Sequence, residues 1–457
     1  YYINLSKDSY KLGGSSFAQI LNKIGAETPD IKDAVQFKKA FNTLQQLIKE
    51  GKIQAGHDVG SGGLITTLLE MCFADQNLGA SLDLSSLAAQ DVIKLLFAEN
   101  IAVVFQADAS AEETLTKAGV EFHKIGEVKS SISLEIKNFD ENLSFDVAHL
   151  RDVWFKTSYL LDEKQTGAGL AKERYTNYKN QPLKYNFPAH FDGQKPNLDI
   201  LRKSGDRPKA AILREKGSNS EREMANAMYL AGFDVKDIHM TDLISGRENL
   251  EDIQFIGAVG GFSNSDVLGS AKGWAGAFLY NEKAKTVLEN FFARPDTLSV
   301  GICNGCQLFI ELGLINKNHD KKPKMLHNKS GKHESIFTSL TLQENNSVML
   351  SSLAGSTLGV WVSHGEGQFS LPYSEDKYKI VAKYGYESYP ANPNGSDYNT
   401  AMICDETGRH LVMMPHIERS LFQWHWANYP KGRNDEVSPW MEAFINARKW
   451  VEEQKTT

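Results

Sequence analysis

A cysteine between two glycines is the first candidate for chemistry in this chain. Residues 301–305 read G-I-C-N-G, with Cys303 at the joint between a short apolar run at 298–302 and a helix-like run. This is the G-x-nucleophile-x-G pattern of a nucleophile elbow, in which the turn is too sharp for side chains at the flanking positions. A helix N-terminus behind such a residue favours the nucleophilic thiolate. The pattern predicts Cys303 as a nucleophile, with an incidental buried cysteine as the alternative.

A second cysteine, Cys306, completes a C-x-x-C motif and opens two other interpretations. Thioredoxin-like redox pairs stand at a helix start in this way. A zinc site would need further ligands at suitable spacing, and the sequence has no second C-x-x-C. We expect Cys306 to point inward, one turn into the helix.

A cysteine nucleophile needs a general base, and the base needs a group that orients it. Two histidine–glutamate pairs have suitable spacing after apolar stretches: His416 with Glu418, and His364 with Glu366. Residues i and i+2 of an extended segment point to the same side, so either glutamate can hold the imidazole of its own pair. Spacing alone does not choose between the two pairs.

Acyl chemistry also needs hydrogen-bond donors for an oxyanion. Residues 259–266 read V-G-G-F-S-N-S-D, which is a strand end that opens into bare backbone. We expect the N–H groups of Gly261 and Phe262 to serve as donors, together with the N–H of Asn304 directly after the nucleophile. An ordinary glycine loop is the alternative.

The elements that must position these residues follow from the alternation of strands and helices in residues 207–457. The pattern predicts buried strands at 209–213, 255–259 and 298–302, and a helix at 220–232 that ends at a glycine. Such alternation is typical of an α/β fold with a doubly wound, mostly parallel sheet. Ligands of these sheets bind at the carboxyl ends of the strands, where the elbow is expected.

Two further segments precede this domain. Residues 1–150 mix predicted helices and strands, which indicates an α+β domain. Residues 151–206 are polar and charged, and we expect a helix followed by a linker. The glycine and proline of L-R-K-S-G-D-R-P at 201–208 mark the boundary to the third segment.

Composition excludes several classes of partner. The 457 residues are 23% charged with a formal net charge of −7 and no basic tract, so we expect no nucleic acid. Four cysteines argue against a disulfide framework and for the reducing cytoplasm. No apolar run approaches the roughly 20 residues of a membrane span, so we expect no membrane partner. The chain begins with Tyr1 rather than Met, and we expect a fragment of a longer protein.

Five motifs follow one another in residues 207–457: G-G-F-S-N-S-D-V-L-G, G-I-C-N-G-C-Q, S-H-G-E-G, N-P-N-G-S and M-P-H-I-E-R. In this order they resemble the glutamine amidotransferase domain of the phosphoribosylformylglycinamidine synthase family. Residues 1–150 resemble the last synthetase subdomain of the large, single-chain form, through L-G-G-S-S and H-D-V-G-S-G-G-L. The upstream synthetase domains of that form are the expected partners within the same chain.

The resemblance implies that glutamine is hydrolysed at Cys303 through a γ-glutamyl thioester, with His416 as base and Glu418 as its orienter. It implies that Gln307 and His364 belong to the glutamine pocket. The released ammonia would pass to the synthetase. There ATP would activate the amide of formylglycinamide ribonucleotide, and ammonia would replace its oxygen, which is a step of purine biosynthesis. The implied cofactors are ATP and Mg²⁺.

The loop at 57–63 departs from the family pattern, because H-D-V-G-S-G-G stands where the family has H-D-x-S-D-G-G. The resemblance implies Asp58 as a Mg²⁺ ligand. It places Gly60 and Ser61 at the nucleotide phosphate, where the backbone N–H groups of Gly60 to Gly63 would face the phosphate in place of the lost serine contact. A glycine loop that caps a helix is the alternative.

Two other functions stay open. A cysteine hydrolase or peptidase of the same fold would use residues 1–150 to bind its substrate. A non-catalytic docking module would need no intact Cys–His–Glu set. Turnover of glutamine rather than of a peptide distinguishes the amidotransferase from both.

Overall fold

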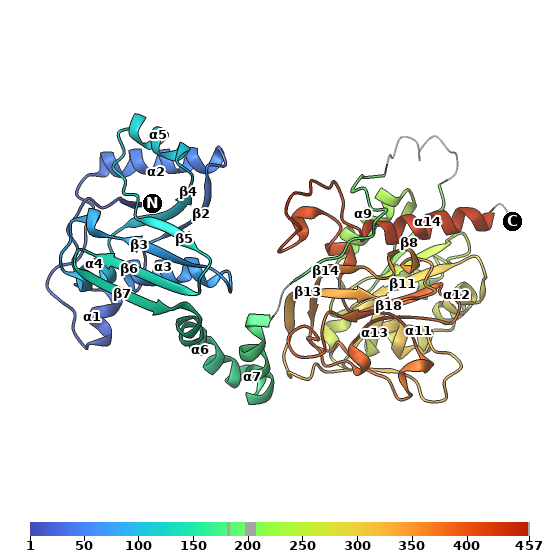
Figure 1. The fold of residues 1–457 in the computed structure, drawn as a ribbon. Coiled ribbons are helices and arrows are strands. Elements are labelled where there is room, and N and C mark those ends of the chain that lie inside the picture. Colours follow the sequence, from blue (N-terminus) through green and yellow to red (C-terminus); the bar gives the residue numbers. More distant parts are fainter. Residues whose placement is uncertain (181–182, 197–206, 456–457) are drawn as a thin grey trace. The chain divides into compact units, whose positions relative to one another are not determined.

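The computed structural model describes residues 1–180, 183–196 and 207–455, and the chain divides into two compact units, Tyr1–Leu160 and Leu161–Thr457 (Figure 1). The boundary expected at 201–208 lies mostly outside the described residues. Every helix in the described ranges is too short or too polar to cross a membrane.

Unit 1 is built on two small sheets. The first has the order β1–β4–β2, from Tyr2–Asn4, Ala102–Ala107 and Ile53–Asp58. The second has the order β5–β3–β6–β7, from Gly126–Lys129, Gly79–Asp83, Ser133–Asn138 and Glu141–Asp146. Only the β3–β6 pair is parallel among the described strands of this unit. The mixture of sheets and helices is an α+β arrangement.

Helices pack against both faces of the first sheet. Helices α3 (Gly63–Phe73) and α4 (Val92–Phe97) share one hydrophobic cluster with residues of both sheets. Helices α2 (Ala34–Lys49) and α5 (Ser110–Lys117) form a second cluster with β1 and β4. The short helix α1 (Ser16–Ile20) is mostly exposed.

Two consecutive helices lead out of unit 1. Helix α6 (Val147–Thr166) begins in unit 1 and ends in unit 2, and α7 (Ala168–Asn177) follows it. Gly167 between them has a φ of 82°, a conformation that favours glycine and that breaks the helix. The end of α6 is therefore fixed by the sequence at this glycine.

Unit 2 is organised around a nine-stranded sheet of order β14–β13–β16–β17–β18–β11–β10–β8–β9. In chain order these strands are β8 (Lys209–Arg214), β9 (Asp234–His239), β10 (Phe255–Ala258), β11 (Leu298–Ile302), β13 (Glu334–Leu342), β14 (Thr357–His364), β16 (Lys379–Tyr384), β17 (Thr400–Cys404) and β18 (His410–Met413). Strands β12 (Lys324–Leu326) and β15 (Gln368–Ser370) form a separate antiparallel pair.

Helices cover both faces of this sheet. They are α9 (Glu221–Ala231), α10 (Met240–Ser245), α11 (Lys272–Leu279), α12 (Glu282–Ala293), α13 (Asn304–Glu311) and α14 (Met441–Lys455). Figure 1 shows α9 and α14 on one face, and α11 and α13 on the other. This confirms the predicted α/β class with its doubly wound sheet.

The sheet has a parallel half and an antiparallel half. Strands β18, β11, β10, β8 and β9 are parallel neighbours, and the predicted strands β8, β10 and β11 lie side by side among them. Strands β14, β13, β16 and β17 continue the sheet in antiparallel fashion up to β18. Helix α9 ends at Gly232, whose φ of 102° closes the helix as predicted.

Candidate active site

Cys303 lies on the turn between β11 and α13, at the carboxyl edge of the parallel half. Its φ of 53° and ψ of −105° are strained for a residue other than glycine. Its N–H donates to the carbonyl of Met413 at 2.8 Å. A Cβ at Gly301 would lie 2.6 Å from the carbonyl oxygen of Gly305, and one at Gly305 would lie 2.0 Å from that of Ala258. Close backbone approach therefore requires both glycines of the elbow.

His416 and Glu418 form a buried pair beside this elbow. The Nδ1 atom of His416 lies 2.6 Å from Oε1 of Glu418. Glu418 lies in a short 3-10 turn over Ile417–Arg419 and His416 is the residue that caps its start, so the two do not share the extended segment expected from their spacing. The N–H of His416 donates to the carbonyl of Trp361 at 2.8 Å, which fixes this turn to β14.

The His416 imidazole faces the thiol across a glycine. A Cβ at Gly260 would lie 2.8 Å from Cε1 of His416 and 3.4 Å from Cβ of Cys303. Burial lowers the pKa of His416, but the charge of Glu418 and the contact with Cys303 outweigh it and raise the pKa to about 10. The Nε2 atom is buried and has no hydrogen-bond partner among the described residues. It is the ring nitrogen left for the thiol.

The alternative pair, His364 with Glu366, does not form. His364 is buried at the end of β14, and its Nδ1 lies 3.2 Å from Oδ1 of Asn328. Burial and then the charge of His416 lower the pKa of His364 to about 3, so its ring is neutral. The carboxylate of Glu366 instead accepts from the N–H of Ser270 at 2.6 Å and from the Ser270 hydroxyl.

One of the expected oxyanion donors is already used. The N–H of Phe262 donates to the carbonyl of Gly217 at 2.9 Å, so the prediction for Phe262 is wrong. The N–H of Gly261 has no partner among the described residues. The N–H of Asn304 stands in the first turn of α13, where backbone donors have no intrahelical acceptor. These two N–H groups remain as donors.

The side chains of Asn304 and Gln307, at the start of α13, connect this helix to the loops that contain Ser263 and Glu366. Asn304 accepts from the N–H of Ser263 at 3.1 Å and donates to Oε1 of Gln307 at 2.8 Å. Gln307 donates to the carbonyl of Glu366 at 2.7 Å. Both ends of the Gln307 side chain are thus engaged, and Gln307 fastens the loops instead of offering a free amide to a substrate.

Sequence reasoning missed the contact of Ser270 with Glu366, because it joins segments 96 residues apart. The nearby Asp266 belongs to the same loop as Ser270, and burial followed by the charge of Glu366 raises its pKa. The sequence feature that could have indicated this contact is the position of Glu366 inside the S-H-G-E-G motif.

Cys306 points inward, as expected. It is fully buried, and burial followed by the charge of Cys303 raises the pKa of its thiol well above the ordinary value. All four cysteines are unpaired, so no Cys303–Cys306 disulfide is present.

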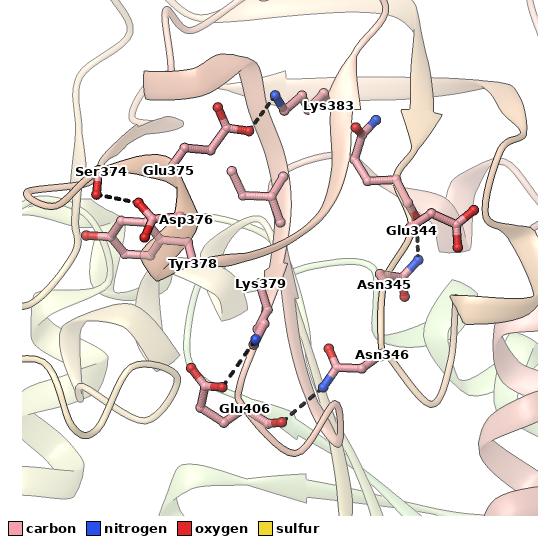
Figure 2. A pocket seen from close by; sticks show the side chains of 12 residues that line it. Glu344, Asn345, Asn346, Ser374, Glu375, Asp376, Tyr378, Lys379, Lys383 and Glu406 are labelled. Carbon is pink, nitrogen blue, oxygen red and sulfur yellow. Dashed lines mark hydrogen bonds and ion pairs between the residues drawn. The ribbon is translucent and has the colours of Figure 1, made fainter.

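A separate polar cavity of about 1020 Å³ lies in unit 2, lined by none of the predicted site residues. Figure 2 shows two ion pairs among the side chains that line it. Lys383 meets Glu375 at 2.7 Å, and Lys379 meets Glu406 at 3.5 Å. None of its lining residues belongs to the candidate site, so this cavity takes no part in that site.

The loop at 57–63 of unit 1 contains one carboxylate, that of Asp58, and a run of backbone N–H groups. Asp58 ends β2 with an exposed carboxylate, and the described residues contain no group of three ligands for a metal. Mg²⁺ is usually held by one or two carboxylates together with water and substrate phosphates, so Asp58 would supply one ligand and the rest of the shell would come from water and nucleotide. The N–H of Gly62 donates to Glu99 at 2.9 Å and that of Gly63 to the Gly60 carbonyl at 3.0 Å. Of the four N–H groups of Gly60 to Gly63, those of Gly60 and Ser61 have no partner among the described residues.

Comparisons with known proteins match both units. Residues 207–451 match the model of a CobB/CobQ-like glutamine amidotransferase domain, and residues 5–137 match the C-terminal domain of AIR synthase related protein. A probable phosphoribosylformylglycinamidine synthase, chloroplastic/mitochondrial, of Arabidopsis thaliana is 37% identical over 484 residues, which covers 99% of this chain and 34% of the relative. The phosphoribosylformylglycinamidine synthase of Homo sapiens is 37% identical over 487 residues, which covers 98% of this chain and 36% of the relative.

Among solved structures, PurLQS from Thermotoga maritima is 23% identical with a TM-score of 0.42, and the match covers 54% of this chain and 100% of that chain. The chain spans about a third of the length of the curated relatives it matches. The amidotransferase model covers more than half of the 457 residues. This chain therefore belongs to the family of CobB/CobQ-like glutamine amidotransferase domains.

Proposed function

We propose that this chain is the glutaminase-bearing part of a phosphoribosylformylglycinamidine synthase. The observation that carries the proposal is a thiol on a strained elbow, side by side with an imidazole whose charge a buried carboxylate stabilises. The named relatives match along 98% and 99% of this chain, which supports this enzyme over other amidotransferases.

In the first half-reaction, the Cys303 thiolate attacks the side-chain carboxamide carbon of glutamine, and the carbonyl oxygen becomes an oxyanion. The N–H groups of Gly261 and Asn304 donate to this oxyanion. The His416 imidazolium then gives its Nε2 proton to the amide nitrogen, which leaves as ammonia. A γ-glutamyl thioester remains on the sulfur.

In the second half-reaction, the neutral His416 takes a proton from water, and the hydroxide attacks the thioester carbonyl. The thiolate leaves as glutamate is released, and the ion pair with the imidazolium is restored. Glu418 stabilises the imidazolium and fixes the ring orientation in both steps. The sum is glutamine and water giving glutamate and ammonia.

The activity of the whole protein is part of the same proposal. ATP activates the amide oxygen of formylglycinamide ribonucleotide, ammonia replaces that oxygen, and the oxygen leaves with phosphate as ADP forms. The division of labour is the one expected from the sequence: a synthetase subdomain at 1–150, a helical linker at 151–206 and the glutaminase at 207–457. A cytoplasmic location is proposed as well, supported by four unpaired cysteines.

The test uses a glutamine-mimicking electrophile followed by mass spectrometry of the labelled peptide. We expect label on Cys303 and none on Cys306, whose thiol is buried and protonated. In the whole protein, Cys303→Ala should abolish glutamine-dependent formation of the amidine and spare the ammonia-dependent reaction. Equal loss of both activities, or turnover of a peptide in place of glutamine, would refute the proposal.

A further inference from the structure

Helix α6 ends in a cluster of charged side chains that the proposed mechanism does not use. We call it the anchor cluster, and it comprises Asp162, Arg174, Lys332, Glu334 and Tyr389. The side chains of Asp162 and Glu334 are only 9% and 5% exposed. The cluster thus holds two carboxylates in the interior of unit 2.

Arg174 and Lys332 are the cations that balance these carboxylates. The Nη1 atom of Arg174 lies 3.4 Å from Asp162, and Nη2 lies 3.8 Å from Glu334. Lys332 approaches Asp162 at 3.5 Å. The hydroxyl of Tyr389 donates to Glu334 at 2.9 Å and accepts from Arg174, whose guanidinium lies over the Tyr389 ring. Removing one partner of such a set leaves a buried charge uncompensated.

The cluster connects the helices to the start of β13. Asp162 belongs to the last turn of α6 and Arg174 to α7, whereas Lys332 and Glu334 flank His333 where β13 begins. A displacement of α6 or α7 therefore moves His333 with its two neighbours.

From His333 the contacts reach the nucleophile in two steps. The Nε2 atom of His333 lies 3.0 Å from the hydroxyl of Ser363. The carbonyl of Ser363 lies 3.6 Å from Sγ of Cys303. A second set of contacts runs through Asn328, which donates to the carbonyl of Lys332 at 2.9 Å and contacts the ring of His364, the residue after Ser363.

We propose that Asp162 and Arg174 are positioning residues of the glutaminase. They hold the segment 332–334, this segment holds Ser363, and Ser363 sets the direction of the Cys303 thiol. The inference rests on the proposed function of Cys303. Its physical basis is that a misplacement of about 1 Å far from the chemistry can cost roughly 100-fold in rate. A cluster that only stabilised the fold would not act on the thiol selectively.

The first experiment compares Arg174→Met with Lys172→Met in the whole protein. Lys172 is an exposed residue of the same helix, and its side chain makes no hydrogen bond or ion pair with the residues that the structure describes, so it is the matched control. Arg174→Met should lower the glutaminase kcat and the labelling rate of Cys303 by about 10-fold, with a much smaller change in KM. The ammonia-dependent reaction should keep its rate. Arg174→Lys should restore part of the loss, because it returns the charge without the planar fork.

The second experiment is a double-mutant cycle between Arg174→Met and His333→Ala. If Arg174 acts through His333, the two losses of labelling rate are strongly non-additive. If Arg174→Met fails to fold, Tyr389→Phe replaces it in the cycle, since it removes one hydroxyl and no charge. Tyr389→Phe should give a smaller loss in the same direction.

The outcomes separate the inference from the function it rests on. Wild-type rates in Arg174→Met, additive losses in the cycle, or an equal loss of the ammonia-dependent reaction would each overturn the positioning role and leave the glutaminase intact. Failure of the wild-type protein to be labelled at Cys303 would instead overturn the proposed function and the inference with it.

Discussion

The Nδ1 atom of His416 lies 2.6 Å from Oε1 of Glu418, and both side chains are 2% exposed or less. A neutral carboxyl or a solvated one could not hold a charged imidazole in this interior. Because Nδ1 is bound to Glu418, Nε2 is the ring nitrogen that is free to exchange a proton at the thiol.

The first prediction removes the charge of this contact. In Glu418→Gln, burial is no longer opposed by the carboxylate, so the pKa of His416 falls and less of the imidazolium that protonates the leaving amide nitrogen is present. We expect glutaminase kcat to fall roughly 100-fold, with KM for glutamine changed far less. Steady-state kinetics and the labelling rate of Cys303 between pH 5 and pH 10 (roughly the span over which a histidine titrates) check this.

Glu311→Gln is the matched control, because Glu311 is an exposed acid at the end of α13. It should behave as the wild type. A Glu418→Gln variant with normal kcat across the pH range would mean that another group supplies the charge.

The second prediction concerns the loops over the site. Ser270→Ala removes the hydroxyl that donates to Glu366 and leaves only the backbone contact. The two loops then close less firmly, and we expect KM for glutamine to rise several-fold while kcat stays near the wild-type value. Ser265→Ala, in the exposed part of the same loop, should change neither constant. A drop in kcat at constant KM would place Ser270 in the chemistry.

The third prediction tests the packing of the elbow. Gly305→Ala puts a Cβ 2.0 Å from the carbonyl oxygen of Ala258, and backbone cannot swing away as a side chain can. We expect a loss of about 3 kcal/mol in the free energy of unfolding of unit 2. Gly169→Ala in α7 has open space around it and should be neutral or stabilising by up to about 1 kcal/mol. Denaturant titrations of both variants decide the matter.

Features that depend on local backbone geometry could be predicted from the sequence, whereas features that depend on long-range pairing could not. The elbow and the end of α9 were predictable, because a positive φ or a close backbone approach demands glycine locally. The parallel half of the sheet followed from the alternation of strand and helix. Its antiparallel half did not, because pairing of β13, β14 and β16 depends on segments that meet only in the folded chain.

In the candidate site, too, local spacing predicted some residue pairs, but long-range contacts could not be predicted. His416 and Glu418 were paired correctly from their spacing, but a 3-10 turn rather than an extended segment brings them together. Phe262 was expected to offer its N–H, and the partner that occupies it, Gly217, stands 45 residues earlier in the chain. Long-range hydrogen bonds of this kind leave no local pattern.

The fourth prediction is a pH dependence of stability. His410 is buried, its Nδ1 contacts the hydroxyl of Ser299 at 2.9 Å, and burial lowers its pKa to about 3. The unfolded chain binds a proton at this residue below about pH 6.5, whereas the folded chain does not until about pH 3. The contribution of His410 is therefore complete above pH 6.5 and is lost as pH falls toward 3, at about 1.4 kcal/mol per pH unit.

His410→Gln removes this titration, so its stability should decline less steeply than that of the wild type over the same range. Urea unfolding at pH 6.5 and pH 4.5 (roughly the upper part of the window) measures the two slopes. Equal slopes would mean that His410 is already charged in the folded protein.

The two units have separate hydrophobic cores: two clusters among residues 2–147 in unit 1 and one among residues 183–451 in unit 2. Heat should consequently unfold the chain in more than one calorimetric transition, and a single melting temperature would be an average without a molecular meaning. A substitution such as Gly305→Ala should shift the transition of its own unit and leave the other endotherm in place. Scanning calorimetry can thus assign damage to the glutaminase or to its neighbour before any activity is measured.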